Sequence, residues 1–170
     1  MNKRYKWILI VTILSFIITI IFSVLSDIIL SKTGLIIGII TIFVFILIGV
    51  LFDIIGLAAA SATDRSFHAM ASKKVKSTNT AKKLIKNSSK VSSICNDVIG
   101  DICNIMSGTA TVVVVNNITL NYNLNHTIVL LLVTSIVAAL TIGLKAYGKD
   151  IALKNKDYII MKISDILNKN

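Results

Sequence analysis

Two carboxylates lie one helical turn apart inside a stretch that is otherwise largely apolar. Asp97 and Asp101 belong to residues 91–115, a run long enough to cross a bilayer as a helix. An ionisable side chain at membrane depth is costly, and it usually faces a bundle interior, a polar cavity or an ion path. Carboxylates at this spacing most often act as ligands or as hydrogen-bonding groups between helices. The neighbouring helices must therefore supply a polar environment for this one.

The composition indicates a membrane protein. Of the 170 residues, 55% are hydrophobic, and the mean hydropathy is +0.83. A soluble domain of this size could not bury so much apolar surface. The sequence predicts a single all-α, polytopic membrane domain with about four transmembrane helices. Cys95 and Cys103 are too far apart along the polar helix to bridge within it, so we expect two buried thiols.

The order of apolar and polar stretches gives the expected elements. We predict a first helix over 7–25, which is retained because no cleavage site of small residues follows it. The next elements are a second helix over 35–62, a basic juxtamembrane region over 64–90, the polar third helix over 91–115 and a fourth helix over 127–144. An uncharged loop is expected over 116–126, and a tail over 147–170 ends the chain.

Two regions are predicted to be amphipathic. In the basic region, apolar residues recur at near-helical spacing, which predicts two short helices broken around residues 77–80. Several of its lysines are expected to contact anionic lipid headgroups: Lys73, Lys74, Lys76, Lys82 and Lys83. A solvated cytoplasmic loop is the alternative. The C-terminal helix is expected to place Ile159, Ile163, Ile166 and Leu167 on one face, against the membrane or a partner.

Charge placement predicts the topology. The chain has 18 Lys and Arg residues against 8 acids, a formal charge of +10. Four spans with a cytoplasmic N-terminus leave only Lys32 outside, as the positive-inside rule expects. We therefore predict a multi-pass protein of the plasma membrane with both termini in the cytoplasm. The same bias accounts for the charge without a nucleic-acid partner.

Three segments carry a specific order of features. Residues 51–87 combine a small-residue helix end with a basic region. Residues 90–105 read KVSSICNDVIGDICNI and contain the pair Gly100-Asp101. Residues 143–155 read GLKAYGKDIALKN. In this order the segments resemble the transmembrane domain of the CNNM/CorB/CorC magnesium and cobalt transport family, whose members have a Gly-Asn pair in the third helical region and a later Gly-Glu-x-x-Pro-Lys-x-x-Ala-x-x-Asn signature.

The resemblance implies a dimeric membrane domain with a polar, inward-opening cavity that holds a dehydrated divalent cation. Mg²⁺ prefers oxygen ligands, and the candidates in the matching region are Asp97, Asp101, Asn96, Ser92 and Ser93. Members of the family usually continue into cytoplasmic CBS domains. Besides the lipid bilayer and a second copy of the chain, a separate cytoplasmic regulatory chain is therefore a candidate partner.

The third segment also departs from the family signature. Lys145 stands where the signature has its acidic residue, and Gly148 stands where it has proline. An ammonium group removes a ligand and repels a divalent cation, more strongly at low dielectric. One hypothesis is that Lys145 forms an ion pair with Asp101 or Asp97 in the place of the cation, because buried charges need a partner. The alternative is that Lys145 extends to the membrane surface at the end of its helix.

Asp53 interrupts the second apolar run, and two interpretations are open for its side chain. It could join the polar site as a gate or ion-pair partner, or mark a helix end near the interface. The predicted function is that of a CorB-like protein in divalent cation transport or binding, with Mg²⁺ as the ion. The alternative is a degenerate, non-transporting family member that acts as a structural or regulatory subunit. No enzyme is predicted, because no nucleophile with a base, metal-binding His motif or phosphate-binding Gly loop accompanies the carboxylates.

Overall fold

The computed structural model describes residues 3–30, 34–63 and 78–168, and every element in these ranges is a helix. Four helices are long and apolar enough to cross a membrane: Tyr5–Val24, Leu35–Ser61, Ser88–Tyr122 and His126–Lys154. The predicted all-α class with four such helices is confirmed. The predictions for Lys73, Lys74 and Lys76 lie outside the described residues.

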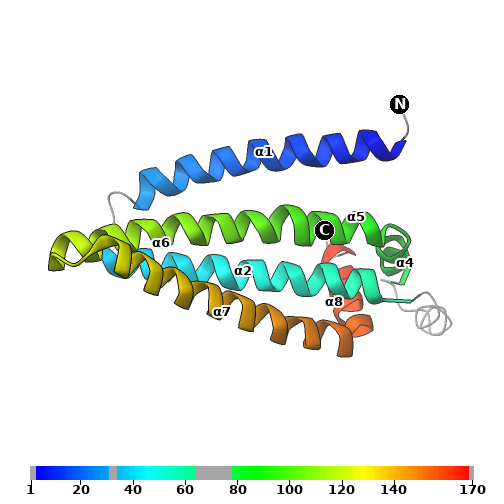
Figure 1. Ribbon diagram of the computed structural model, residues 1–170. Helices are drawn as coiled ribbons and strands as arrows, with labels where there is room; N and C mark the ends of the chain where they lie inside the picture. The colour runs from blue at the N-terminus through cyan, green and yellow to red at the C-terminus, as the bar shows by residue number, and fades with distance from the viewer. Residues whose placement is uncertain (1–2, 31–33, 64–77, 169–170) are drawn as a thin grey trace.

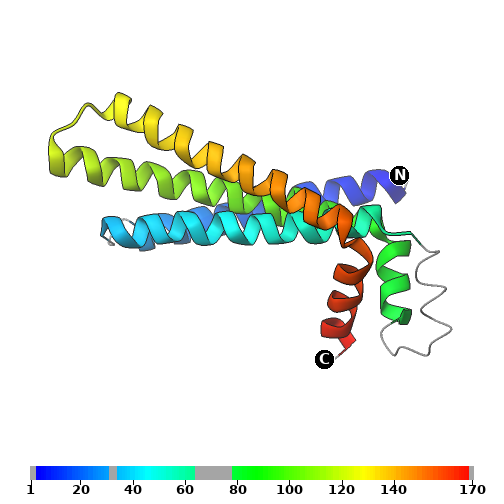
Figure 2. The ribbon, with the colours of Figure 1, turned by 90° about the horizontal axis from the view of Figure 1, so that it is seen from below.

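The long helices run along one common direction (Figure 1). They are α1 (Lys3–Leu30), α2 (Leu35–Ser61), α6 (Asp101–Tyr122) and α7 (His126–Lys154). Two short helices, α4 (Thr78–Lys86) and α8 (Lys156–Asn168), lie at one end of the bundle. Figure 2 shows that the N- and C-termini are at this same end, which we call the α4/α8 end.

Helix α2 is the centre of the bundle and contacts every other helix except α1 closely. Ile42, Ile46 and Val50 form a buried stripe at helical spacing, and they pack against Ala110 and Val114 of α6. Small residues on α2 allow the helix backbones to approach, which favours dispersion packing in a membrane. The three glycines on this face, Gly38, Gly49 and Gly56, are all buried.

A second apolar cluster fixes the short helices at the α4/α8 end. Ala58 and Ala59 of α2, Ala81 and Ile85 of α4, and Ile160 of α8 are buried together. The apolar face of α4 therefore packs on α2 and α8. The break expected around residues 77–80 is close to the observed start of α4.

The C-terminal helix packs on the bundle through a face beside the predicted apolar one. Ile160 and Ser164 are fully buried, Ile159 packs at the edge of the same cluster, and Ile166 and Leu167 are 61% and 55% exposed. Contact of the predicted face with the membrane or a partner stays a prediction. The Ser164 hydroxyl donates to the Ile160 carbonyl oxygen. Its hydrogen bond is thus satisfied inside the helix, and a polar residue can occupy the buried face. The tail also begins later than expected, because α7 continues to Lys154.

The prediction of a loop over 116–126 is wrong for residues 116–122, because α6 continues to Tyr122. Asn117 and Thr119 donate from their side chains to backbone carbonyl oxygens of the preceding turn. These bonds satisfy the polar groups without breaking the helix. Asn123 then adopts the left-handed conformation (φ 50°) that ends a helix. The Asn125 side chain accepts from two backbone N–H groups at the start of α7.

The third long helix is not a regular α-helix throughout. It begins as α5 (Ser88–Ser92), continues as the π-helix η1 (Ser93–Gly100) and becomes α6 at Asp101. The apolar pattern of the sequence does not predict this wider segment. Such segments occur frequently at functional sites, and this one contains Asn96 and Asp97 and ends next to Asp101.

Candidate functional site

A partly buried ion pair joins α2 to α7. Lys145 Nζ lies 2.8 Å from Asp53 Oδ2, and the two side chains are only 20% and 14% exposed. The hypothesis that Lys145 pairs with Asp101 or Asp97 is therefore wrong in its partner. Asp53 is thus the ion-pair partner, a role that the sequence left open for it.

The absence of a side chain at Gly100 explains how Asp53 reaches this position. A methyl group at Gly100 would lie 2.6 Å from Asp53 Oδ1 and 3.3 Å from the Cys95 carbonyl oxygen. The carboxylate of α2 thus lies against the backbone of the third helix. Only glycine allows this approach, and it brings Asp53 within reach of Lys145 on the neighbouring α7.

Asp97 and Asp101 lie on an exposed face of the third helix, next to the ion pair. Asp97 Oδ2 accepts a hydrogen bond from Ser93 Oγ at 2.7 Å. Asp101 is near enough to interact electrostatically with Lys145, Asp97 and Asp53. We call Asp53, Asp97, Asp101 and Lys145 the charged cluster. When all four groups are ionised, three carboxylates face one ammonium group, which leaves an excess of negative charge.

The five predicted ligands are divided between two faces of the helix. Asp97, Asp101 and Ser93 belong to the charged cluster or contact it. Asn96 Nδ2 donates to Ser92 Oγ at 3.3 Å, and the Asn96 amide lies against Gly56 of α2, where a Cβ atom would collide with it. Ser92 and Asn96 therefore serve the contact with α2.

The carboxylates do not form a closed metal cage. Within the ranges that the structure describes, no group of three or more His, Cys, Asp or Glu side chains could hold a metal ion. Mg²⁺ loses its water reluctantly and is commonly bound by one or two carboxylates together with several waters. Asp97 and Asp101 fit this hydrated mode of binding.

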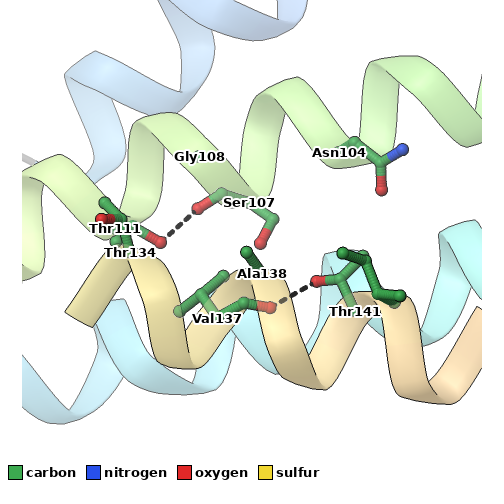
Figure 3. Close-up of a pocket in the computed structure, with 9 residues that line it drawn as sticks. Asn104, Ser107, Gly108, Thr111, Thr134, Val137, Ala138 and Thr141 are labelled. Atoms are coloured by element: carbon green, nitrogen blue, oxygen red, sulfur yellow. Dashed lines mark hydrogen bonds between the residues drawn. The ribbon is translucent and has the colours of Figure 1, made fainter. Parts of the chain in front are cut away.

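A groove between α6 and α7 begins beside the charged cluster. Its volume is 300 Å³, and its polar lining consists of Asn104, Ser107, Thr111, Thr134 and Thr141 (Figure 3). Thr111 and Thr141 donate to the carbonyl oxygens of Ser107 and Val137, as the dashed lines show. Asn104 Oδ1 and Ser107 Oγ are buried and have no hydrogen-bond partner in the described part of the chain. A ligand or water in the groove would satisfy them.

A row of polar residues on α6 links the charged cluster to the groove, whose surface is otherwise mostly apolar. Asn104 lines the groove and lies three residues after Asp101, on the same side of the helix. On α6, polar residues follow at helical spacing through Ser107 to Thr111, so the row extends away from the α4/α8 end. We call this row the polar track. Ser107 and Thr111 were not predicted as site residues, because Ser and Thr in apolar helices often bond only to their own backbone.

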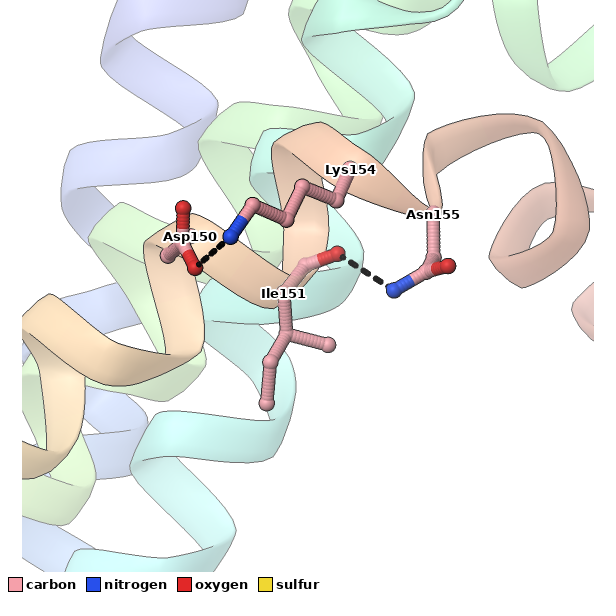
Figure 4. A network of polar contacts seen from close by, with 4 residues as sticks. All are labelled: Asp150, Ile151, Lys154 and Asn155. Carbon is pink, nitrogen blue, oxygen red and sulfur yellow. Dashed lines mark hydrogen bonds and ion pairs between the residues drawn. The ribbon is translucent and has the colours of Figure 1, made fainter.

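The segment aligned with the family signature lies at the end of α7. Ala152 and Gly148 are buried, and Gly148 packs against Val50 and Ile54 of α2. Figure 4 shows Asn155 Nδ2 directed back to the Ile151 carbonyl oxygen, at 3.3 Å, where α7 ends. In this structure Gly148 and Ala152 are packing positions, and Asn155 is the residue at which α7 ends.

An exposed ion pair lies on the same stretch of α7. Lys154 Nζ is 2.7 Å from Asp150 Oδ2, with both side chains more than half exposed (Figure 4). Such an exposed pair contributes little to stability. Asp150 is therefore a useful control for the carboxylates of the charged cluster.

The two thiols are buried and free, as predicted for Cys95 and Cys103. Comparison with known proteins gives no family assignment: no family model, no curated protein and no solved structure matches the chain. The resemblance to the CNNM/CorB/CorC family remains a prediction from the sequence.

Proposed function

We propose that this chain is a CorB-like integral membrane protein that binds and transports a divalent cation, with Mg²⁺ as the cation. The excess of negative charge in the charged cluster supports this proposal. Asp53 is neutralised by Lys145 at 2.8 Å, whereas Asp97 and Asp101 have no Lys or Arg within ion-pair distance among the described residues. A cation of charge +2 would neutralise both.

Each group of the cluster has a distinct role in this proposal. Asp97 and Asp101 supply anionic oxygens, which hard cations such as Mg²⁺ prefer. Ser93 holds the Asp97 carboxylate by a hydrogen bond, and such supporting bonds orient the ligands at metal sites. Ser107 and Asn104 offer polar atoms to the hydrated ion along the polar track. Lys145 repels the ion from Asp53 and so confines it to the exposed face of the third helix.

The proposal includes an orientation and an assembly. The charged cluster lies inside the bundle, away from the α4/α8 end. At a rise of 1.5 Å per residue, the distance along the helix to that end is roughly 12–14 Å for Asp53, Asp97 and Lys145. Almost all described lysines lie between this level and that end, which supports a cytoplasmic location for it by the positive-inside rule. We propose a plasma-membrane protein with both termini in the cytoplasm, assembled as the homodimer that the family resemblance implies.

One observation favours a second candidate function. The ammonium group of Lys145 already occupies the space beside Asp53, where the family resemblance implies an acidic residue. A chain in which this lysine replaces the cation would keep the fold without transport. It would then act as a structural or regulatory subunit of the membrane.

Binding of Mg²⁺ to the purified protein distinguishes the two candidates. If the ion binds only the folded state, stability rises by RT ln(1 + [L]/Kd), which is about 1.4 kcal/mol at ten times Kd. We expect Mg²⁺ to raise the melting temperature of the wild type in detergent, with choline chloride at equal ionic strength as the control. Asp97→Asn/Asp101→Asn should abolish the rise, and Asp150→Asn should retain it.

The variant Lys145→Glu tests the second candidate. It restores an acidic residue at the position where the family signature has one. No response of the wild type to Mg²⁺, together with a clear response of Lys145→Glu, would show that the lysine has replaced the ion. No response of either folded protein would contradict a cation site in the charged cluster.

A further inference from the structure

A basic cavity lies at the α4/α8 end, between the start of α1 and the start of the third helix. It has a volume of 630 Å³. We call it the basic pocket, and its polar lining consists of Lys6, Lys86, Asn87, Ser88, Ser89 and Lys90. Trp7 and Ile10 of α1 complete the walls. None of these residues belongs to the charged cluster or to the polar track.

The chemistry of the pocket suits an anion. Three ammonium groups line it without any carboxylate. None of the three forms an ion pair within the described residues. Lys90 Nζ lies 5.0 Å from the centre of the Trp7 ring, so a cation–π contact positions this ammonium group at the wall. The hydroxyls of Ser88 and Ser89 are further donors. Ammonium and hydroxyl donors together are the groups that bind phosphate oxygens.

The level of the pocket in the bundle points to the source of the phosphate. The apolar span of α1 begins at Tyr5, and that of the third helix begins at Ser88. The pocket lies at both starting points and therefore at the level of lipid headgroups. Trp7 is typical of this boundary. Ile10, one turn further into the span, gives the inner wall an apolar surface on which an acyl chain can pack.

We propose that the basic pocket is a specific site for the phosphate-bearing headgroup of an anionic membrane lipid. The phosphate is bound by Lys6, Lys86 and Lys90. The acyl chains continue along the exposed apolar face of α1. This site differs from the lysine contacts predicted on the outer surface of α4, because it is an open groove whose walls come from two segments distant in the sequence. It does not depend on the proposed cation transport.

Trp7 is the single tryptophan of the chain, so its fluorescence reports directly on the pocket. The protein is reconstituted in vesicles of ordinary phosphatidylcholine to which a small fraction of one brominated lipid is added. The brominated lipid is either phosphatidylglycerol, which is anionic, or phosphatidylcholine, which is neutral. Bromine quenches tryptophan at short range. We expect the brominated anionic lipid to quench Trp7 at a much lower mole fraction than the neutral one, on the order of tenfold lower.

Matched variants separate the pocket from general attraction to negative lipid. Lys86→Gln/Lys90→Gln should remove the preference for the anionic lipid. The control variant Lys83→Gln/Lys149→Gln removes the same amount of charge from exposed lysines outside the pocket. It should keep the preference for the anionic lipid. Quenching is normalised to each variant in lipid without bromine, because Lys90 contacts the ring. Lys86→Arg/Lys90→Arg should restore the preference, which also shows that the pocket is intact.

Three results would overturn the proposal. One is equal quenching of the wild type by both brominated lipids. Another is an equal loss of preference in the pocket variant and the exposed-lysine variant, which would indicate only diffuse electrostatic attraction. The third is release of quenching by millimolar inorganic phosphate, which would assign the pocket to a soluble phosphate compound. A preference that is lost only in the pocket variant and persists in phosphate would support the lipid site.

Discussion

Lys145→Ala is expected to destabilise the folded protein by about 2 kcal/mol, because it leaves the partly buried Asp53 carboxylate without its partner. Asp53 is only 14% exposed, and its partner is 2.8 Å away. Asp53→Ala should cost a similar amount, since it leaves the ammonium group unpaired between α2 and α7. Unfolding in mixed detergent micelles measures both free energies.

The double variant Asp53→Ala/Lys145→Ala completes the test. It removes both charges, so its loss of stability should be clearly smaller than the sum of the two single losses. A second cycle with Asp101→Ala serves as a matched control, because Asp101 senses the charge of Lys145 without an ion pair. A coupling to Asp101 as large as that to Asp53 would contradict the observed pairing.

Gly56→Ala is expected to destabilise the protein by about 2 kcal/mol, because the new methyl group collides with the Asn96 amide. Alanine normally favours a helix over glycine by about 1 kcal/mol, so the predicted loss is opposite in sign to the propensity effect. The collision would separate α2 from the π-helix and disturb the neighbouring charged cluster. The free energy of unfolding in mixed micelles is again the measured quantity.

Two glycines of the same chain provide controls. Gly108 and Gly143 have no heavy atom within 4 Å of an added Cβ atom, so Gly108→Ala and Gly143→Ala should be neutral or slightly stabilising. Asn96→Ala in the background of Gly56→Ala should recover part of the lost stability, because it removes the colliding amide. Equal effects of all three glycine substitutions would exclude a close contact at Gly56.

The sequence was sufficient for the parts of the fold that depend on local apolar patterning. Apolar runs near the length of a bilayer predicted the four long helices, with α2 correct to within one residue at its end. The helix extensions at Asn117 and Thr119 were missed, because a polar side chain that bonds to its own helix looks the same in the sequence as one in a loop. The buried Ser164 was missed for the same reason.

The candidate site depended on information that one sequence does not contain. The three carboxylates were selected because they interrupt apolar runs, and Lys145 was selected from its place in the family signature. The stated hypothesis paired Lys145 with Asp101 or Asp97, whereas its partner is Asp53. That partner is decided by the close approach of α2 at Gly100, which is a property of helix packing. The π-helix changes which side chains face α2 and which face outward, and no apolar periodicity predicts it. Prediction of the polar track would have required the position of α7 relative to α6, which one sequence does not give.

Mg²⁺ uptake by proteoliposomes that contain a magnesium-sensitive dye tests the proposed function most directly. We expect the wild type to admit Mg²⁺ faster than protein-free liposomes, and Asp97→Asn/Asp101→Asn to lower uptake to the protein-free level. Asp150→Asn, at an exposed site on α7, should transport at the wild-type rate. Uptake by the wild type at the protein-free level, or uptake by the folded double variant at the wild-type rate, would contradict transport through the charged cluster.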